Sequence, residues 1–150
     1  MIFSTTSEYA LRALAFLART QRGQVVLGRE LAAHTGIPPK YLAKVMLSLR
    51  NAGLIGTSRG TGGGYSLLRP ADGIHLVDVV EIFEGPAARP QCLLGVNAQC
   101  SEGHPCTAHL AWRNVRQTYV EFLEATTLQD IAYAPPHVNS SPRFSHRNVR

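Results

Sequence analysis

The chain has 150 residues, enough for one domain with a sizeable core, and lacks a run of about 18 apolar residues that would span a membrane. Its amino terminus has no basic region followed by an apolar segment, so we expect neither a secretory signal nor a location outside the cytoplasm. The net charge of +5 is less informative than its distribution along the chain.

Charge divides the chain into a basic and an acidic part. Residues 1–70 carry nine basic and two acidic side chains, a net charge of +7. Residues 71–133 carry three basic and eight acidic ones, a net charge of −5, and the last 17 residues add three arginines. This asymmetry predicts that only the amino-terminal half faces a polyanion, although clustered solvated charge would give the same pattern.

Apolar spacing predicts a first helix over residues 5–20, with Thr5 and Glu8 at the spacing of a capping box. A short helix over 29–35 is predicted to end at Gly36, which accepts the left-handed conformation. A third helix is predicted to begin at Pro38-Pro39, where a missing N–H does no harm, and to end near Asn51. Its inner, apolar face consists of Leu42, Val45, Met46 and Leu49.

Residues 54–68 contain two short apolar runs around a glycine-rich tip and predict a β-hairpin. A fourth helix is predicted from Leu76 to Gly85 by apolar residues at helical spacing. A long helix over 107–125 has apolar residues that alternate four and three positions apart, a seam typical of helix pairing. These residues are Ala108, Trp112, Val115, Tyr119 and Phe122. Thr127 is predicted to cap a last short helix, and the tail from Ala134 to be disordered.

The order of helix, short helix, turn, helix and hairpin predicts a winged helix-turn-helix that binds DNA. The third helix would enter the major groove with its amino-terminal residues nearest the bases, while Arg59 at the hairpin tip would reach the minor groove. The candidate DNA contacts are Lys40, Tyr41, Lys44, Arg50, Arg59 and Thr61. Taken singly, each of these residues favours a solvated helix face or a simple turn. Taken in order, and with the +7 charge of residues 1–70, they favour DNA binding. A nucleotide-binding loop is disfavoured because no Gly-Lys-Ser/Thr follows the glycines.

The three cysteines of the chain, Cys92, Cys100 and Cys106, lie within 15 residues of one another, and His109 follows. An odd number cannot pair fully within one chain, and three thiolates suit an iron–sulfur cluster or zinc. The tight Cys-x2–4-Cys knuckle usual for zinc is absent, while a metal-free thiol switch stays open. An enzyme with a Cys106–His109 nucleophile is disfavoured, because no other catalytic feature accompanies it.

Four segments, 9–14, 36–42, 49–54 and above all Arg-Gly-Thr-Gly-Gly-Gly-Tyr at 59–65, resemble the Rrf-type winged-helix regulators, the family of IscR and NsrR. The resemblance runs from residue 1 to about 132. It implies a homodimer whose long helices cross, a palindromic double-stranded DNA operator, and a cluster before the long helix. The cluster would be 4Fe–4S, which we favour, or 2Fe–2S.

The family also implies a fourth cluster ligand besides the cysteines. The IscR-like branch uses a histidine separated from the last cysteine by two residues, which corresponds to His109. The NsrR-like branch uses an acidic residue near the start of the partner's first helix, which corresponds to Glu8. The seven-residue gap between Cys92 and Cys100 is closer to NsrR-like and iron-responsive members, so we favour Glu8 with His109 as the alternative. Glu8 stands where the NsrR-like branch usually has an aspartate, and Ala43 stands where IscR has a glutamate in its recognition helix.

We therefore expect a mainly α protein with a small β-hairpin wing and a long carboxy-terminal dimerisation helix. The expected parts are a winged helix-turn-helix at 1–85, a cluster-binding loop at 86–106, a dimerisation helix and short terminal helix at 107–133, and a disordered tail at 134–150. The expected function is a non-enzymatic, cytoplasmic repressor whose operator affinity depends on an iron–sulfur cluster sensing nitric oxide, redox or iron status. The alternative is a metal-free thiol or zinc redox regulator on the same fold.

Overall fold

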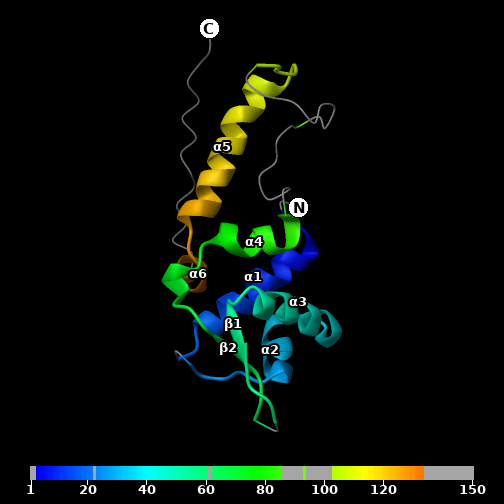
Figure 1. The fold of residues 1–150 in the computed structure, drawn as a ribbon, viewed down its shortest axis with the longest axis vertical. Helices are drawn as coiled ribbons and strands as arrows, with labels where there is room; N and C mark the ends of the chain where they lie inside the picture. Colours follow the sequence, from blue (N-terminus) through cyan, green and yellow to red (C-terminus); the bar gives the residue numbers. More distant parts are fainter. Residues whose placement is uncertain (1–2, 22, 61, 86–92, 94–102, 134–150) are drawn as a thin grey trace.

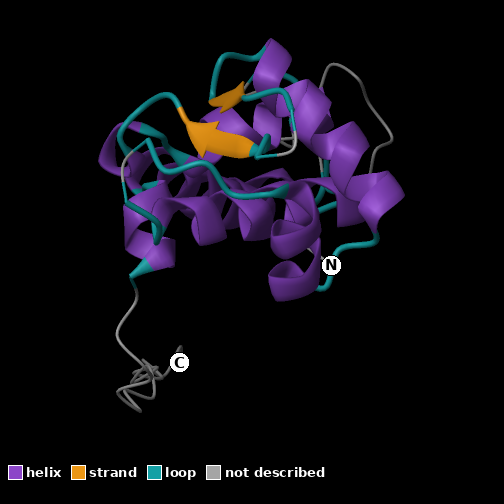
Figure 2. Cartoon of the chain, turned by 90° about the horizontal axis from the view of Figure 1, so that it is seen from below, coloured by secondary structure: helices purple, strands orange, loops and turns teal. Residues whose placement is uncertain are grey.

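A computed structural model describes residues 3–21, 23–60, 62–85, 93 and 103–133. Helices make up most of this part, and the two short strands form one small ribbon on its surface (Figures 1 and 2). In chain order the elements are α1 (Thr5–Ala18), α2 (Gly28–Thr35), α3 (Pro39–Asn51), β1 (Ile55–Thr57), β2 (Tyr65–Leu67), the 3-10 helix η1 (Ala71–Gly73), α4 (Leu76–Glu84), α5 (His109–Ala125) and α6 (Leu128–Ala132).

Helix α1 is the centre of the winged-helix body and contacts α2, α3, α4 and α6. Its small and branched side chains Ala10, Ala13, Leu14 and Leu17 are buried, so neighbouring helices approach it closely. Burying a leucine of this kind stabilises the fold by roughly 1.5–3 kcal/mol. The first helix is therefore fixed by packing on several sides.

The start of α1 differs from the predicted capping box. The helix is capped by Ser4, whose hydroxyl oxygen accepts from the Ser7 backbone N–H at 3.3 Å. Thr5 is the first helical residue, and the Glu8 side chain lies outside the cap. The prediction was wrong by one residue, because serine and threonine at positions 4–7 all suit an N-cap and sequence alone does not rank them.

The helix-turn-helix matches the prediction closely. Helix α2 ends at Thr35 and is capped by Gly36, which has a φ of 67° and whose N–H donates to the Ala32 carbonyl oxygen at 2.9 Å. Helix α3 starts at Pro39, and its buried face is the predicted one. This burial orients the opposite face of α3 toward solvent.

The hairpin pairs β1 with β2 antiparallel, with Gly56 opposite Ser66. Val26 extends the ribbon, because it exchanges two backbone hydrogen bonds with Tyr65 at 2.8 and 2.9 Å. A Cβ atom on Gly64 would lie 2.0 Å from the Val26 carbonyl oxygen, so only glycine permits this approach. Gly64 of the wing is thus required by close backbone packing, while Gly60, with a φ of 103°, is required by the turn.

Helices α4 and α5 share a second apolar cluster, in which Leu76, Val80 and Leu123 are buried. Helix α5 begins at His109, two residues later than predicted, and its first half extends away from the winged-helix body (Figure 1). Along the predicted seam, Val115 and Phe122 are 56% and 48% exposed. Within the described residues, one chain leaves part of this apolar face uncovered.

Helix α6 is capped by Thr127 as predicted, but its packing was not foreseen. Leu128 and Ala132 belong to the main core, and the Arg19 Nε donates to the Ala132 carbonyl oxygen at 2.7 Å. The Tyr133 hydroxyl donates to the Ala18 carbonyl oxygen at 2.8 Å. The end of the described chain therefore returns to α1. The tail predicted to be disordered lies outside the described residues.

Candidate nucleic-acid interface and sensor region

The exposed face of α3 carries the predicted recognition residues. Lys40, Tyr41 and Lys44 are exposed, while Leu42 and Val45 on the other face are buried. Lys40 and Lys44 are one helical turn apart, so both ammonium groups lie on one side of the helix. Such a pair is suited to phosphate oxygens or guanine edges in a major groove.

Tyr41 is oriented by a contact with the first helix. Its ring meets the Tyr9 ring edge to face, with centroids 6.4 Å apart. The Tyr9 ring also lies 5.7 Å from the guanidinium carbon of Arg12. Although Tyr41 is 62% exposed, its ring is supported by α1, which reduces the number of orientations it can adopt.

The wing carries Arg59 on its exposed tip, between the pair Ser58–Gly64 and the turn at Gly60. The N–H groups and carbonyl oxygens of Ser58 and Gly64 exchange hydrogen bonds at 3.0 and 3.1 Å, and Gly60 has a φ of 103°. Arg59 is thus exposed next to the hydrogen-bonded pair at the base of the tip. Arg50 is exposed near the end of α3, and Thr61 lies outside the described residues.

Sequence reasoning overlooked Leu47, which is 49% exposed on the same side of α3 as Lys44. Together with Ala43 it lines a shallow cavity of about 220 Å³ between α3 and the wing. The sequence contained a signal for this position, because Leu47 follows Lys44 by three residues and so lies on the same helix face. An apolar side chain among basic ones is suited to a thymine methyl group.

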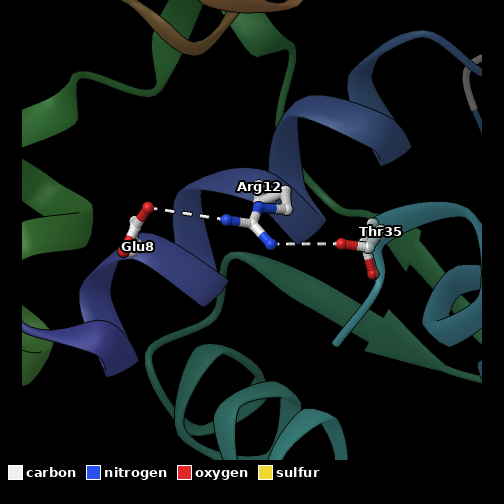
Figure 3. A network of polar contacts seen from close by, with 3 residues as sticks. All are labelled: Glu8, Arg12 and Thr35. Atoms are coloured by element: carbon white, nitrogen blue, oxygen red, sulfur yellow. Dashed lines mark hydrogen bonds and ion pairs between the residues drawn. The ribbon is translucent and has the colours of Figure 1, made fainter. Parts of the chain in front are cut away.

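A polar network joins α1 to the helix-turn-helix (Figure 3). The Arg12 guanidinium lies between Glu8 and Thr35, with one nitrogen 3.5 Å from the Glu8 Oε1 and another 3.3 Å from the Thr35 carbonyl oxygen. The Glu8 and Arg12 side chains are 47% and 45% exposed, so their ion pair contributes only about 0.2–1 kcal/mol to stability. Its main effect is to position Arg12 at the last turn of α2.

The sensor region is described in part. Cys106 is half-buried just before α5, and the His109 N–H donates to the Cys106 carbonyl oxygen at 3.0 Å. This backbone turn places Cys106 and His109 at the start of α5, where His109 is only 9% exposed. Cys92 and Cys100 lie outside the described residues. Among the residues with a described position, no three His, Cys, Asp or Glu side chains gather as metal ligands.

The described donors are nevertheless chemically suited to an iron–sulfur cluster. Cys106 supplies a half-buried thiol just before α5, and Glu8 supplies an exposed carboxylate that is not used for helix capping. Helix α1, which carries Glu8, lies well below the start of α5 in Figure 1. A shared site would need a second subunit. His109 is the local alternative.

The described residues contain no helix that is both long and apolar enough to cross a membrane. A buried helix-turn-helix core, a basic exposed face on α3 and an arginine on the wing define a winged-helix protein that binds DNA. The chain belongs to the Rrf2 family of transcriptional regulators, whose sequence profile, described as iron-dependent transcriptional regulator, matches residues 3–134.

Individual relatives agree with this assignment. A protein of Aquifex aeolicus described as an HTH-type transcriptional regulator is 38% identical over 133 residues, or 87% of this chain and 91% of that one. The structure of CymR, the global cysteine regulator of B. subtilis, matches with a TM-score of 0.73 at 31% identity, covering 87% of this chain and 95% of CymR. The IscR of T. potens matches with a TM-score of 0.67 at 26% identity, covering 85% and 83%. The predicted family and winged-helix fold are thus confirmed.

Proposed function

We propose that this chain is a homodimeric, cytoplasmic repressor whose affinity for a palindromic operator depends on an iron–sulfur cluster. The observation that carries the proposal is the position of Arg12, which bonds both Glu8 and the last turn of α2. A candidate cluster ligand is thereby connected to the helix-turn-helix that reads DNA. The amino-terminal winged helix, the loop with the cysteines and α5 would serve as reading, sensing and dimerising parts.

The reading surface consists of the exposed face of α3 and the wing. Lys40 and Lys44 would contact phosphates or guanines, Tyr41 the backbone, and Leu47 a thymine methyl group. Arg50 would bind the backbone, and Arg59 with Thr61 would approach the minor groove. Apart from Thr61, which lies outside the described residues, these side chains are all exposed.

The dimer would form along α5. Val115 and Phe122 are exposed, and Tyr119 and Trp112 are half-buried beside them, so the face presents apolar area that a second α5 would cover. Two reading surfaces held at a fixed separation bind half-sites one helical turn of DNA apart or a multiple of it. A palindromic operator follows from this symmetry.

The cluster would be bound by Cys92, Cys100 and Cys106, with Glu8 of the partner subunit as the fourth ligand and His109 as the alternative. We favour a 4Fe–4S over a 2Fe–2S cluster. When bound, it supplies a group that reacts with nitric oxide or oxidants and depends on iron supply. Ligation by Glu8 would weaken the hold of that carboxylate on Arg12. The turn between α2 and α3 would then move more freely relative to α1, and the two reading surfaces would lose their fixed separation.

A metal-free thiol or zinc regulator is the second candidate, favoured by the similarity to CymR, which is described as a cysteine regulator. In that case the three cysteines would act through reversible oxidation or bind zinc. DNA recognition would be unchanged, because it uses α3 and the wing. The two candidates therefore differ only in the chemistry of the cysteine segment.

Anaerobic purification followed by visible absorbance and assays for iron and acid-labile sulfide separates the two candidates. The proposal requires a coloured protein with iron and sulfide, both lost in a Cys92→Ala/Cys100→Ala/Cys106→Ala variant. A colourless protein that binds DNA and contains zinc or no metal would support the second candidate. The fourth ligand is identified with Glu8→Ala and His109→Ala variants, and Glu30→Ala serves as a matched acidic control. The variant that lacks the fourth ligand should lose the cluster faster in air than the other two.

A further inference from the structure

Glu84 lies at the point where α4 ends and α1 begins. Its Oε1 accepts from the Ser4 backbone N–H at 2.9 Å and from the Ser7 hydroxyl at 2.5 Å. The Ser7 side chain is completely buried, and its hydroxyl oxygen in turn accepts from the Ser4 hydroxyl at 3.3 Å. One carboxylate oxygen thus joins Glu84 to Ser7 and Ser4, which lie 77 and 80 positions earlier in the chain.

The location is unfavourable for a carboxylate unless α1 is present. Glu84 is the last residue of α4, where the helix dipole is negative. Ser4 is the N-cap of α1, where the dipole is positive and a backbone N–H needs an acceptor. The negative charge is therefore stabilised by the neighbouring helix. Hydrogen bonding by Ser4 and then Ser7 lowers the pKa of Glu84, which agrees with this arrangement.

The same junction contacts the long helix. Tyr119 of α5 packs against the apolar cluster that α4 and α5 share, and burial first and the Glu84 charge second raise the pKa of its phenol. The Phe3 ring, next to Ser4 in the chain, packs against the Tyr119 ring with centroids 6.3 Å apart. Helices α1, α4 and α5 thus meet at one place, and α5 is the helix proposed to form the dimer.

We propose that Glu84 is a positioning residue that sets the orientation of the reading surface relative to α5. The inference rests on the proposed dimeric operator binding. Helix α1 packs on both α2 and α3, so an α1 held firmly to α4 gives each reading surface a fixed direction from the dimer helices. Without the Glu84 bonds, α1 is held at this end by apolar packing alone, which is less directional. Each surface would still fit one half-site, but the two would no longer be held at one separation.

The test compares full chains on DNA that the wild-type protein selects from a random library. Dissociation constants are measured for the complete palindrome, for a single half-site, and for palindromes with the half-site spacing changed by one base pair. For Glu84→Gln we expect about tenfold weaker binding to the palindrome, less than about twofold change on the half-site, and a reduced preference for the selected spacing. Ser7→Ala should shift binding in the same direction, and the double variant should lose no more than Glu84→Gln alone.

Asp72→Asn is the matched control, because it removes the same negative charge on η1, away from the junction. It should keep the wild-type ratio of palindrome to half-site affinity. An unchanged ratio and spacing preference in Glu84→Gln would overturn the inference, as would an equal loss on palindrome and half-site. Wild-type protein that selects only single half-sites or no DNA would overturn both the inference and the proposed dimeric function. Palindrome binding without cluster dependence would count against the proposed sensor and leave the role of Glu84 standing.

Discussion

The Arg12 guanidinium donates to the Thr35 carbonyl oxygen across 3.3 Å and thereby ties the first helix to the last turn of α2. Thr35 precedes the left-handed Gly36, after which α3 begins at Pro39. A single side chain of α1 therefore contacts the segment that sets the direction of the recognition helix.

Replacing Arg12 should affect operator binding more than stability. Arg12→Ala removes a partly exposed bond, so we expect the free energy of unfolding to fall by only about 1 kcal/mol in chemical denaturation. Operator affinity should fall roughly fivefold, because the turn between α2 and α3 loses its link to α1. Arg12→Lys keeps the charge but cannot bond Glu8 and Thr35 at once. Its operator affinity should therefore lie between those of the wild type and Arg12→Ala. Wild-type operator affinity in Arg12→Ala would refute this role.

Lys44 is predicted to contribute affinity through phosphate contacts. Lys44→Ala should weaken binding to all DNA sequences alike and lower the slope of log affinity against log salt by about 1, because one fewer counterion is released. Titrations at several salt concentrations measure this slope. Arg116→Ala, which removes the same charge from α5, serves as control and should leave the slope unchanged. A Lys44→Ala loss confined to one base position would instead indicate a base contact.

The apolar face of α5 is predicted to hold the dimer together. Val115→Glu places a charge where 56% of the side chain is exposed in one chain and would be buried in the dimer. Sedimentation velocity should show a shift from dimer to monomer at micromolar concentration. Gln117→Glu adds the same charge on the side of α5 opposite the seam and should remain dimeric. If Val115→Glu sediments as the wild type does, the dimer forms elsewhere.

The Glu84 carboxylate should make stability depend on pH in the acid range. Its pKa lies below the ordinary value of 4.5 because Ser4 and Ser7 donate to the ionised form. The stabilisation is fully present above the unfolded-state pKa and is lost as pH falls through the lower folded-state pKa. Thermal unfolding between about pH 5 and pH 3 should therefore show a steeper loss for wild type than for Glu84→Gln. Parallel pH profiles would show that these bonds do not persist in solution.

Local patterns sufficed to predict much of this molecule from its sequence. The apolar faces of α3 and α4, the Gly36 turn and the hairpin each depend on residues close together in the chain. The contacts of Glu84 with Ser7, of Arg19 with Ala132 and of Val26 with Tyr65 could not be predicted, because they join segments far apart and have no periodicity. The cap at Ser4 was missed because several adjacent hydroxyl residues compete for that position.

The candidate site was likewise predictable only where local sequence patterns determine it. The exposed positions of Lys40 and Lys44 were predicted because charge opposite an apolar stripe marks a solvent-exposed helix face, and their contacts with DNA stay predictions. Leu47 was missed because an isolated exposed leucine resembles ordinary surface. The role of Arg12 in the network could not be predicted, because no sequence pattern pairs it with Thr35. The ligand roles of Cys92, Cys100, Cys106 and Glu8 stay predictions.

The central claim is tested most directly by measuring operator affinity before and after nitric oxide, on anaerobically purified wild type and on the Cys92→Ala/Cys100→Ala/Cys106→Ala variant. We predict that nitric oxide changes the wild-type affinity at least about tenfold, a difference of 1.4 kcal/mol between the two states, and leaves the variant unchanged. A triple variant that responds to nitric oxide as the wild type does would contradict the account.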